Sequence, residues 1–320
     1  MKYKEKLYSI TSVSVAVLLF LILVSSIASA SITETLISTP GSPYQHAIYG
    51  NNIVWLDFSN TEPFHVLDLS TKKETLINDN NNKYIPSIYG TQVVWKGDVS
   101  HGYSNIKRDI YMYDLSTKKE TQITTSGSAI DPAIYGDRII WRDYRNGKSD
   151  IYMYDLSTKK ETQITTNKST SSDPHIFSNN IVWIDNRNGN WDIYAYDLTT
   201  HQQIHTTEKS DQTMLAIYGN KIAWIDYSNG KDNLYMGTIS YLPVAAFTAS
   251  PTTGKHPLNV QFTDKSTDAY YWSWNFGDKS TSTLQNPPVH KYTKAGKYTV
   301  SLKVKNAAGS NTKTMFITVK

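Results

Sequence analysis

One segment of the chain occurs twice, letter for letter. The sequence DIYMYDLSTKKETQITT runs from Asp109 to Thr125 and returns from Asp150 to Thr166, one 41-residue step later. It is the end of a longer unit with five versions, whose tryptophans are spaced by 40 to 46 residues: Trp55, Trp95, Trp141, Trp183 and Trp224. A fixed period of this length is typical of repeat architectures, in which each repeat forms one small structural unit.

Each repeat has the pattern of four short strands, which we name a to d in chain order. In the third repeat they are AIYG, RIIWRD, DIYMYDL and ETQITT, between Ala133 and Thr166. Strands b and c are apolar or aromatic at nearly every position, which indicates that both of their faces are covered. A four-stranded sheet that is covered on both faces and recurs about every 42 residues is typical of a β-propeller blade.

The two ends of the repeat array complement each other. The fifth repeat has strands a, b and c but no ETQITT segment, whereas an unattached ETLIST lies at Glu34–Thr39. An N-terminal strand that completes the last blade would leave no open sheet edge. We therefore predict an all-β chain with a five-bladed β-propeller over residues 31–241, closed by the N-terminal strand. The alternative is an open solenoid, which would need polar caps that the sequence lacks.

The DIYxYDL and ETQIT repeats resemble those of the TolB-like propellers. Similar repeats occur in archaeal cell-surface proteins, those of methanogens especially. The resemblance covers Glu34 to about Ser240 and implies the propeller fold. It implies little about function, because propellers of this kind have many different roles.

The period is lost after Ser240, and we predict a second domain over residues 243–320. Two groups of residues there resemble the polycystic kidney disease (PKD) domain: Trp274, Phe276, Gly277 and Asp278, then Tyr292, Gly296, Tyr298 and Val300. The resemblance implies an immunoglobulin-like β-sandwich that serves as a spacer or contact module on extracellular proteins. We expect Trp274 and Phe276 in its core and Asp278 in a turn. Lys279 replaces the family's second glycine, so that turn is expected to differ locally.

The first 30 residues have the pattern of an export signal. Three lysines precede an apolar run from Val13 to Val24, and Ala28-Ser29-Ala30 is a small-residue cleavage site. We predict a signal peptide over residues 1–30 and a mature chain without a membrane span, at the cell surface or outside the cell. A retained membrane anchor is the alternative.

Charge and cysteine content exclude several classes of function. The formal charge of the whole chain is +4, and the signal segment carries +2 of it, so the mature chain keeps only +2. This is too little to indicate nucleic acid as a partner. The chain has no cysteine, which excludes disulfides and thiolate zinc sites.

The sequence contains no motif of a serine hydrolase, a zinc metalloprotease or a phosphate-binding loop. Candidate carboxylates for glycoside hydrolysis, a reaction that needs a pair of acids, follow the blade tryptophans, at Asp57, Asp98, Asp143, Asp185 and Asp226. Because these acids recur once per blade in equivalent environments, we expect them to accept backbone N–H groups at the end of strand b. We read the acids that begin strand c in the same way: Asp109, Asp150 and Asp192. We therefore predict no catalytic residue and no enzymatic activity.

Two loops, DYRNGKSD (Asp143–Asp150) and DNRNGNWD (Asp185–Asp192), are rich in Asp and Asn. Calcium is an alternative reading of them, but they lack the spacing and the final glutamate of an EF-hand. Asn-Gly is first a hairpin-turn signal. We therefore predict no cofactor and no metal site, with calcium as the exception to test.

The connections that differ between repeats are the b–c loops and the d–a connections. In a four-stranded meander both emerge on the same side, so sequence diversity gathers on one face, where loops commonly carry function. The predicted ligand-binding residues lie in these loops: His101, Tyr103, Arg145, Arg187, Trp191 and Tyr227. Such side chains stack on and hydrogen-bond to a sugar or peptide. Drift in unconstrained loops is the alternative.

Together these patterns predict a secreted or surface-associated, non-catalytic protein for binding or structure. Its expected partners are cell-envelope or surface-layer proteins, or glycans. Two alternatives stay open: an enzyme or accessory protein acting on polysaccharide, and an envelope assembly factor by analogy with TolB.

Overall fold

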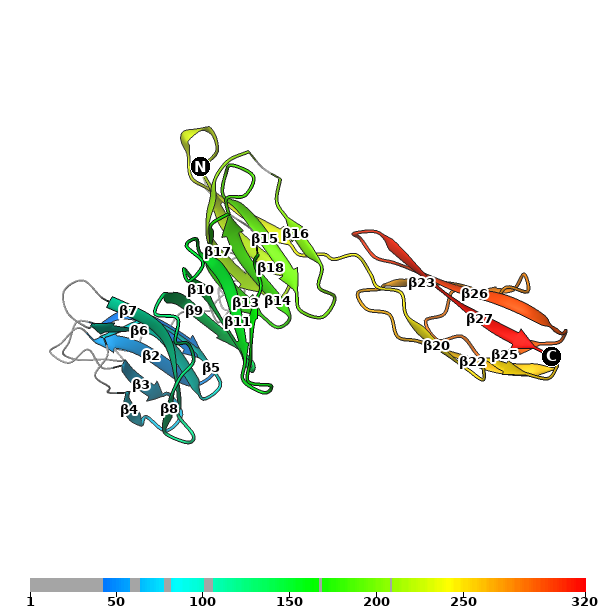
Figure 1. Cartoon of the computed structure of the whole chain (residues 1–320), viewed down its shortest axis with the longest axis horizontal. Coiled ribbons are helices and arrows are strands. Elements are labelled where there is room, and N and C mark those ends of the chain that lie inside the picture. The colour runs from blue at the N-terminus through cyan, green and yellow to red at the C-terminus, as the bar shows by residue number, and fades with distance from the viewer. Residues whose placement is uncertain (1–42, 58–63, 78–81, 101–105, 167–168, 208) are drawn as a thin grey trace, which may run out of the picture. The chain divides into compact units, whose positions relative to one another are not determined.

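The computed structural model describes residues 43–57, 64–77, 82–100, 106–166, 169–207 and 209–320 (Figure 1). These residues form β-strands, their connections and one short 3-10 helix, η1 (Ser228–Gly230). The all-β prediction is confirmed. The predicted signal peptide and Glu34–Thr39 lie outside the described residues. No helix within those ranges is long and apolar enough to cross a membrane.

Five antiparallel sheets follow one another along residues 43–238. The first contains β1 (Pro43–Tyr49), β2 (Asn52–Asp57), β3 (Phe64–Asp68) and β4 (Glu74–Ile77). The second contains β5 (Asn82–Tyr89), β6 (Gln92–Ser100), β7 (Ile106–Asp114) and β8 (Lys119–Gln122). The third contains β9 (Ala129–Tyr135), β10 (Arg138–Asp143), β11 (Asp150–Asp155) and β12 (Lys160–Gln163). The fourth contains β13 (Ser171–Phe177), β14 (Asn180–Asp185), β15 (Asp192–Asp197) and β16 (Gln203–His205). The fifth contains β17 (Gln212–Tyr218), β18 (Lys221–Asp226) and β19 (Asn233–Thr238).

Each strand corresponds to one predicted strand of a repeat, paired in chain order. In the third sheet Trp141 of β10 lies opposite Tyr152 of β11, and the same pairing recurs as Trp183 with Tyr194 in the fourth. The tight a–b turn uses Gly136 at a φ of 58°, a conformation that glycine adopts without a steric cost. The repeated sequence therefore produces a repeated sheet.

Apolar residues fill the seams between neighbouring sheets, which explains the near-continuous apolar pattern of strands b and c. Between the second and third sheets, Val94 and Ile110 on one side meet Ile139 and Trp141 on the other, all of them fully buried. Ring pairs also connect successive a strands, as between Tyr89 and Tyr135, whose centroids lie 4.7 Å apart. Each sheet thus serves as a wall for the next.

The fifth sheet leaves one of these walls uncovered. Leu234 is 77% exposed, although the equivalent Ile110 and Ile151 are fully buried in their seams. Met236 is 70% exposed, whereas the equivalent Met112 is 9% exposed and Met153 is half-buried. Tyr218, the last member of the series of ring pairs, is 79% exposed. In the described part of the chain this sheet has three strands, so its third strand has a free edge.

The C-terminal part is a two-sheet sandwich. One sheet has the order β20 (Phe247–Ser250), β22 (Leu258–Asp264), β25 (His290–Tyr292). The other has the order β21 (Thr253–Gly254), β27 (Ser310–Val319), β26 (Gly296–Lys305), β23 (Tyr271–Asn275), β24 (Thr281–Ser282).

The core between these sheets includes Trp274 and Phe276, which are 0% and 3% exposed, as the sequence predicts. The carboxylate of Asp278 accepts the backbone N–H of Ser280 at 3.0 Å, which is the turn role expected for it. Lys279 adopts a φ of 80°, the left-handed conformation for which a glycine is favoured. The lysine therefore occupies a glycine-type turn position.

Candidate functional site

The b–c loops and the d–a connections lie together, as the meander topology requires. The N–H of Tyr144 in a b–c loop donates to the carbonyl of Ser128 in a d–a connection at 3.3 Å. The equivalent bond runs from Asn186 to Thr170 at 3.3 Å. The connections that vary most between repeats are therefore neighbours on one face of these sheets.

Arg145 on this face is bound within the loop. Its Nη2 donates to Asp143 Oδ2 at 2.6 Å and its Nη1 donates to Glu161 Oε1 at 2.6 Å. Its guanidinium also lies 4.2 Å from the centroid of the Tyr152 ring. These contacts hold the b–c loop against strands c and d, so the side chain has a structural role beyond the one predicted.

Arg187 repeats this arrangement in the fourth sheet. Its Nε and Nη2 donate to the two carboxylate oxygens of Asp185 at 2.9 and 2.7 Å, a bidentate pair. Its guanidinium lies 3.9 Å from the centroid of the Tyr194 ring. Because the same contacts form in two repeats, both arginines belong to the repeating framework of the blade.

The acid at the end of strand b is the centre of each network. Asp143 is 0% exposed and accepts the N–H of Arg145 at 2.9 Å, the indole N–H of Trp141 at 3.0 Å and the hydroxyl of Ser128 at 2.7 Å. Burial alone would raise the pKa of Asp143, but these bonds and that of the Arg145 side chain lower it to about 2. Asp185 likewise accepts the N–H of Arg187 at 3.0 Å. The predicted backbone-capping role is confirmed for both acids.

The Asp- and Asn-rich loops are closed by their own side chains. Asn188 Nδ2 donates to Asp192 Oδ2 and to the hydroxyl of Tyr194, both at 2.9 Å, and Asn146 makes the same two contacts in the third sheet. Within the ranges that the structure describes, no group of three or more His, Cys, Asp or Glu side chains is placed to hold a metal ion. The loops thus have an internal hydrogen-bond explanation, and the absence of a metal site, with calcium as the alternative, stays a prediction.

The remaining predicted ligand residues fall into two groups. Trp191 is half-buried and packs against the core between the fourth and fifth sheets, while Tyr227 is 45% exposed beside η1. The structure does not bring them into one cluster with Arg145. His101 and Tyr103 lie outside the described residues.

An open hollow of about 570 Å³ lies on the same face, at the fourth sheet. It is lined by the b–c loop, the last strand and the d–a connection: Asn188, Gly189, Asn190, Asp192, His205, Thr207 and Lys209. The imidazole of His205 stacks on the ring of Tyr194, with centroids 5.0 Å apart. The hollow therefore combines amide, carboxylate, hydroxyl, imidazole and ammonium groups, and the ring of Tyr194 behind the imidazole is buried.

The d–a part of this hollow was missed by sequence reasoning. His205, Thr207 and Lys209 are not among the predicted ligand residues, most of which lie in the b–c loops. The available signal was that HTTEKS at 205–210 departs from the ITTSGS and ITTNKS of the preceding repeats.

Charged side chains on the first two strands of the third sheet and on the first strand of the fourth form a second cluster that the sequence did not reveal. Arg142 Nη2 lies 2.9 Å from Asp131 Oδ2, and Arg142 also donates to the hydroxyl of Ser172 in the next sheet. Asp173 Oδ1 lies 3.1 Å from His175 Nε2, while its other oxygen accepts the N–H of Leu215 at 3.1 Å. These contacts join the third, fourth and fifth sheets, so the cluster connects each of these sheets to the next.

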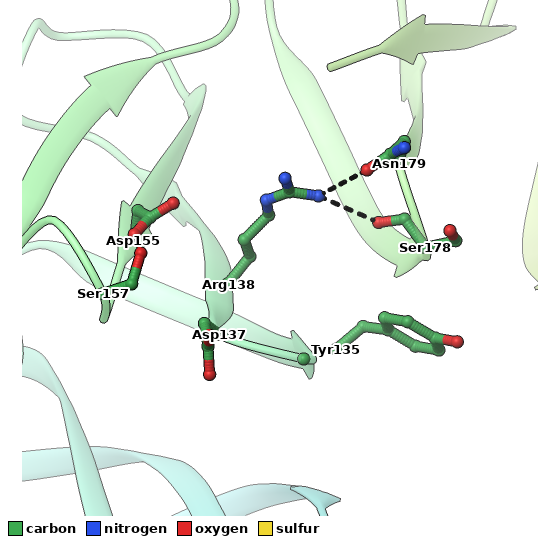
Figure 2. A pocket seen from close by; sticks show the side chains of 8 residues that line it. Tyr135, Asp137, Arg138, Asp155, Ser157, Ser178 and Asn179 are labelled. Carbon is green, nitrogen blue, oxygen red and sulfur yellow. Dashed lines mark hydrogen bonds between the residues drawn. The ribbon is translucent and has the colours of Figure 1, made fainter. Parts of the chain in front are cut away.

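A smaller hollow of about 290 Å³ lies where the a–b turns meet the c–d turns (Figure 2). Figure 2 shows the guanidinium of Arg138 directed at Ser178 and Asn179, where it donates to the Asn179 side-chain oxygen at 2.7 Å. Most of its lining comes from turn positions that recur in the repeats, such as Gly136 and Ser157. The lining of this hollow therefore varies less between repeats than the loop residues at His205.

Residues 245–319 match the family model of the PKD domain. The PKD1 domain of the Vibrio cholerae metalloprotease PrtV is 34% identical over 25% of this chain and 99% of that chain, with a TM-score of 0.22. No curated protein sequence matches the chain.

Solved structures similar to the chain include TolB from Acinetobacter baumannii, with 18% identity over 61% of this chain and a TM-score of 0.44. The chain spans only 54% of that protein. An oligogalacturonate lyase solved with manganese is 12% identical over 63% of each chain, with a TM-score of 0.50. At such identities the likeness concerns the fold alone. The chain thus combines propeller-like sheets, with TolB among their structural neighbours, and a C-terminal segment that matches the PKD domain.

Proposed function

We propose that this chain is a non-catalytic binding protein of the cell surface or envelope, whose propeller-like part binds a glycan or an envelope protein through the loop face. The observation that supports this most is the hollow at His205 on the face where the variable connections gather. The PKD domain serves as spacer or second contact module. Its match and the propeller-like fold fit an extracellular or envelope location.

The chemistry of the hollow suits a neutral or weakly charged polar ligand. Aromatic rings and imidazoles stack on the apolar faces of sugars, while amides and hydroxyls hydrogen-bond to sugar hydroxyls or peptide groups. Asn188 and Asn190 are already bonded to Asp192, which fixes the floor of the hollow. His205, Thr207 and Lys209 are the side chains left to select the ligand.

The double variant His205→Ala, Lys209→Ala is expected to lower ligand affinity at least about tenfold, roughly 1.4 kcal/mol, because it removes the stacking ring and the ammonium group. Glycan-array screening of the unmodified protein identifies the ligand, and titration calorimetry with that glycan measures the change. If no glycan on the array binds, the unmodified protein and the double variant are compared in a pull-down from envelope fractions.

The matched control is His201→Ala with Lys221→Ala. These residues lie at the c–d turn of the fourth sheet and the a–b turn of the fifth, away from the loop face. Equal losses in the two double variants, or full binding by the His205 and Lys209 variant, would contradict the proposed site.

Absence of catalysis is part of the proposal. The carboxylate oxygens of Asp143 and Asp185 accept hydrogen bonds from backbone and side-chain donors of the protein itself. This favours a structural role over proton transfer for these recurring acids. Turnover of any glycan in an activity panel, abolished by substitution of one acid, would replace this reading with the polysaccharide-active alternative.

We also propose that the five sheets form a closed five-bladed ring. Leu234, Met236 and Tyr218 are largely exposed, whereas Ile110 and Ile151, which are equivalent to Leu234, are fully buried, and within the described residues β19 has no fourth strand beside it. The register between strands c and d in the first sheet pairs Val66 with Thr75. The same register in the fifth sheet would place Thr35 opposite Met236. The spacing from Glu34 to β1 also matches the spacing from Glu74 to β5 within one residue.

The closure predicts that a double variant, Thr35→Cys with Met236→Cys, forms an intramolecular disulfide. Cross-strand residues that face each other have the Cβ separation a disulfide needs, and the natural chain has no cysteine to compete. Mass spectrometry of tryptic peptides after mild oxidation detects the bond. Pairing Met236→Cys with Pro40→Cys is the off-register control. A disulfide between two chains instead of within one would contradict closure.

A further inference from the structure

The small charge of the whole chain hides a strong separation between its two parts. Residues 243–320 contain ten lysines, three aspartates and no arginine or glutamate, a formal charge of +7. Residues 31–242 contain 19 Lys and Arg against 24 Asp and Glu, a formal charge of −5. The near-neutral total is therefore the sum of a basic C-terminal domain and an acidic propeller-like part.

Three of the ten lysines lie on one face of the five-stranded sheet. On β26, Val300, Leu302 and Val304 are fully buried. Since side chains alternate along a strand, Lys297, Lys303 and Lys305 point to the opposite, solvent side. We call the outward side chains of β23, β26 and β27 the lysine face.

The rest of the lysine face is rich in hydroxyl groups and contains no acid. Lys303 is paired with Ser273 and Thr312, and Lys305 is paired with Tyr271 and Ser310. The other outward positions of the three strands are Ser, Thr or Asn, apart from Phe316, whose ring lies 4.0 Å from Lys297 Nζ. Two aromatic rings are thus exposed on this face, Tyr271 at 67% and Phe316 at 56%.

The aspartates of the domain do not neutralise this face. Asp264 is 9% exposed and accepts the indole N–H of Trp272 at 2.9 Å. Asp278 is paired with His290 at 2.8 Å and with Ser280. Asp268 lies outside the three strands. The lysines therefore present positive charge that no acid of the face balances.

We propose that the lysine face binds an acidic polysaccharide, one that carries carboxylate groups along its chain. Lysine is a compact point charge that pairs with single carboxylates, whereas phosphate recognition favours the fork of arginine, which the domain lacks. The Ser and Thr hydroxyls exchange hydrogen bonds with sugar hydroxyls, and the ring of Tyr271 offers a stacking surface. This site is independent of the hollow at His205 and lies on another domain.

Full-length protein is titrated with polygalacturonate, with neutral dextran as the uncharged polymer. Binding to polygalacturonate is expected, and its affinity should fall as salt rises from about 50 to about 200 mM, because ion pairs are screened. The triple variant Lys297→Gln, Lys303→Gln, Lys305→Gln should lose at least about tenfold in affinity at low salt and most of the salt dependence.

The control triple, Lys255→Gln, Lys265→Gln, Lys291→Gln, removes the same charge from exposed lysines outside the three strands. Its affinity should change by less than about threefold. Circular dichroism and thermal unfolding verify that both triples fold. Equal losses in the two triples, no binding of the unmodified protein to polygalacturonate, or tighter binding to duplex DNA would overturn the proposal. The triple variant Lys297→Gln, Lys303→Gln, Lys305→Gln should keep the affinity of the His205 hollow for the glycan found on the array, which separates the two sites.

Discussion

Gly277→Ala is expected to destabilise the PKD domain by about 3 to 5 kcal/mol, enough to unfold much of it. Gly277 adopts a φ of 85°, and a Cβ there would lie 2.7 Å from the carbonyl oxygen and 2.9 Å from the nitrogen of Thr299. Both obstacles are backbone atoms of β26, in the middle of the five-stranded sheet, so they cannot move aside as a flexible side chain does. Urea unfolding read out by peptide-resolved hydrogen exchange measures the loss separately for the two parts of the chain.

Two neighbouring positions provide controls for this prediction. At Gly296 the φ is not in the left-handed region and an added Cβ would meet the Tyr298 ring at 3.5 Å, an ordinary contact, so Gly296→Ala should cost less than about 1 kcal/mol. Lys279→Gly should be neutral or stabilise by up to about 1 kcal/mol, because it relieves a side chain at a φ of 80°. If Gly277→Ala unfolded no more readily than Gly296→Ala, the close approach to Thr299 would not be a constraint.

Much of the fold follows from the sequence because repetition multiplies a weak signal. A single RIIWRD could be a buried strand or part of a buried helix, but five versions at 40 to 46 residues with turn residues between them leave one interpretation. The repeat also placed Trp141 and Trp183 in buried strands. The PKD motifs added the second domain directly.

The site was harder to predict because the contacts of a side chain decide what it does, and a residue's type and loop do not reveal them. Arg145 and Arg187 read as ligand residues in a variable loop, but each has a carboxylate two positions earlier and a tyrosine seven positions later that together hold its guanidinium. Their fixed spacing was visible in the sequence, and its recurrence in two repeats was the sign of a framework role. His205 gives no such signal, because its stack on Tyr194 is visible only once strands c and d are paired.

Charge separation between the domains was likewise present in the sequence but hidden by a whole-chain sum. The formal charge of residues 31–320 is only +2, which argued against a nucleic acid partner. This sum averages over two domains, and the PKD domain by itself carries +7. Which lysines share a face depends on strand register, which the buried Val300, Leu302 and Val304 establish.

Asp143→Asn is expected to destabilise the propeller-like part by about 3 to 5 kcal/mol at neutral pH. The substitution removes the charge that pairs with Arg145 Nη2 at 2.6 Å and turns an acceptor of five donors into a group that must itself donate. Asp137→Asn, at the exposed a–b turn of the same sheet, is the matched control and should stay within about 0.5 kcal/mol.

The pH dependence distinguishes loss of this charge from a packing defect. The pKa of Asp143 is lowered in the fold to about 2, from an ordinary value of 3.8, so the unfolded chain takes up the proton first as pH falls. Its contribution of about 2 to 3 kcal/mol is fully present above about pH 5 and is lost progressively as pH falls from about 5 to about 1. The unfolding free energies of the unmodified protein and of Asp143→Asn should therefore converge by that amount over this range. A difference that stays constant down to pH 2 would show that Asp143 stabilises the sheet by its shape, and that its charge contributes nothing.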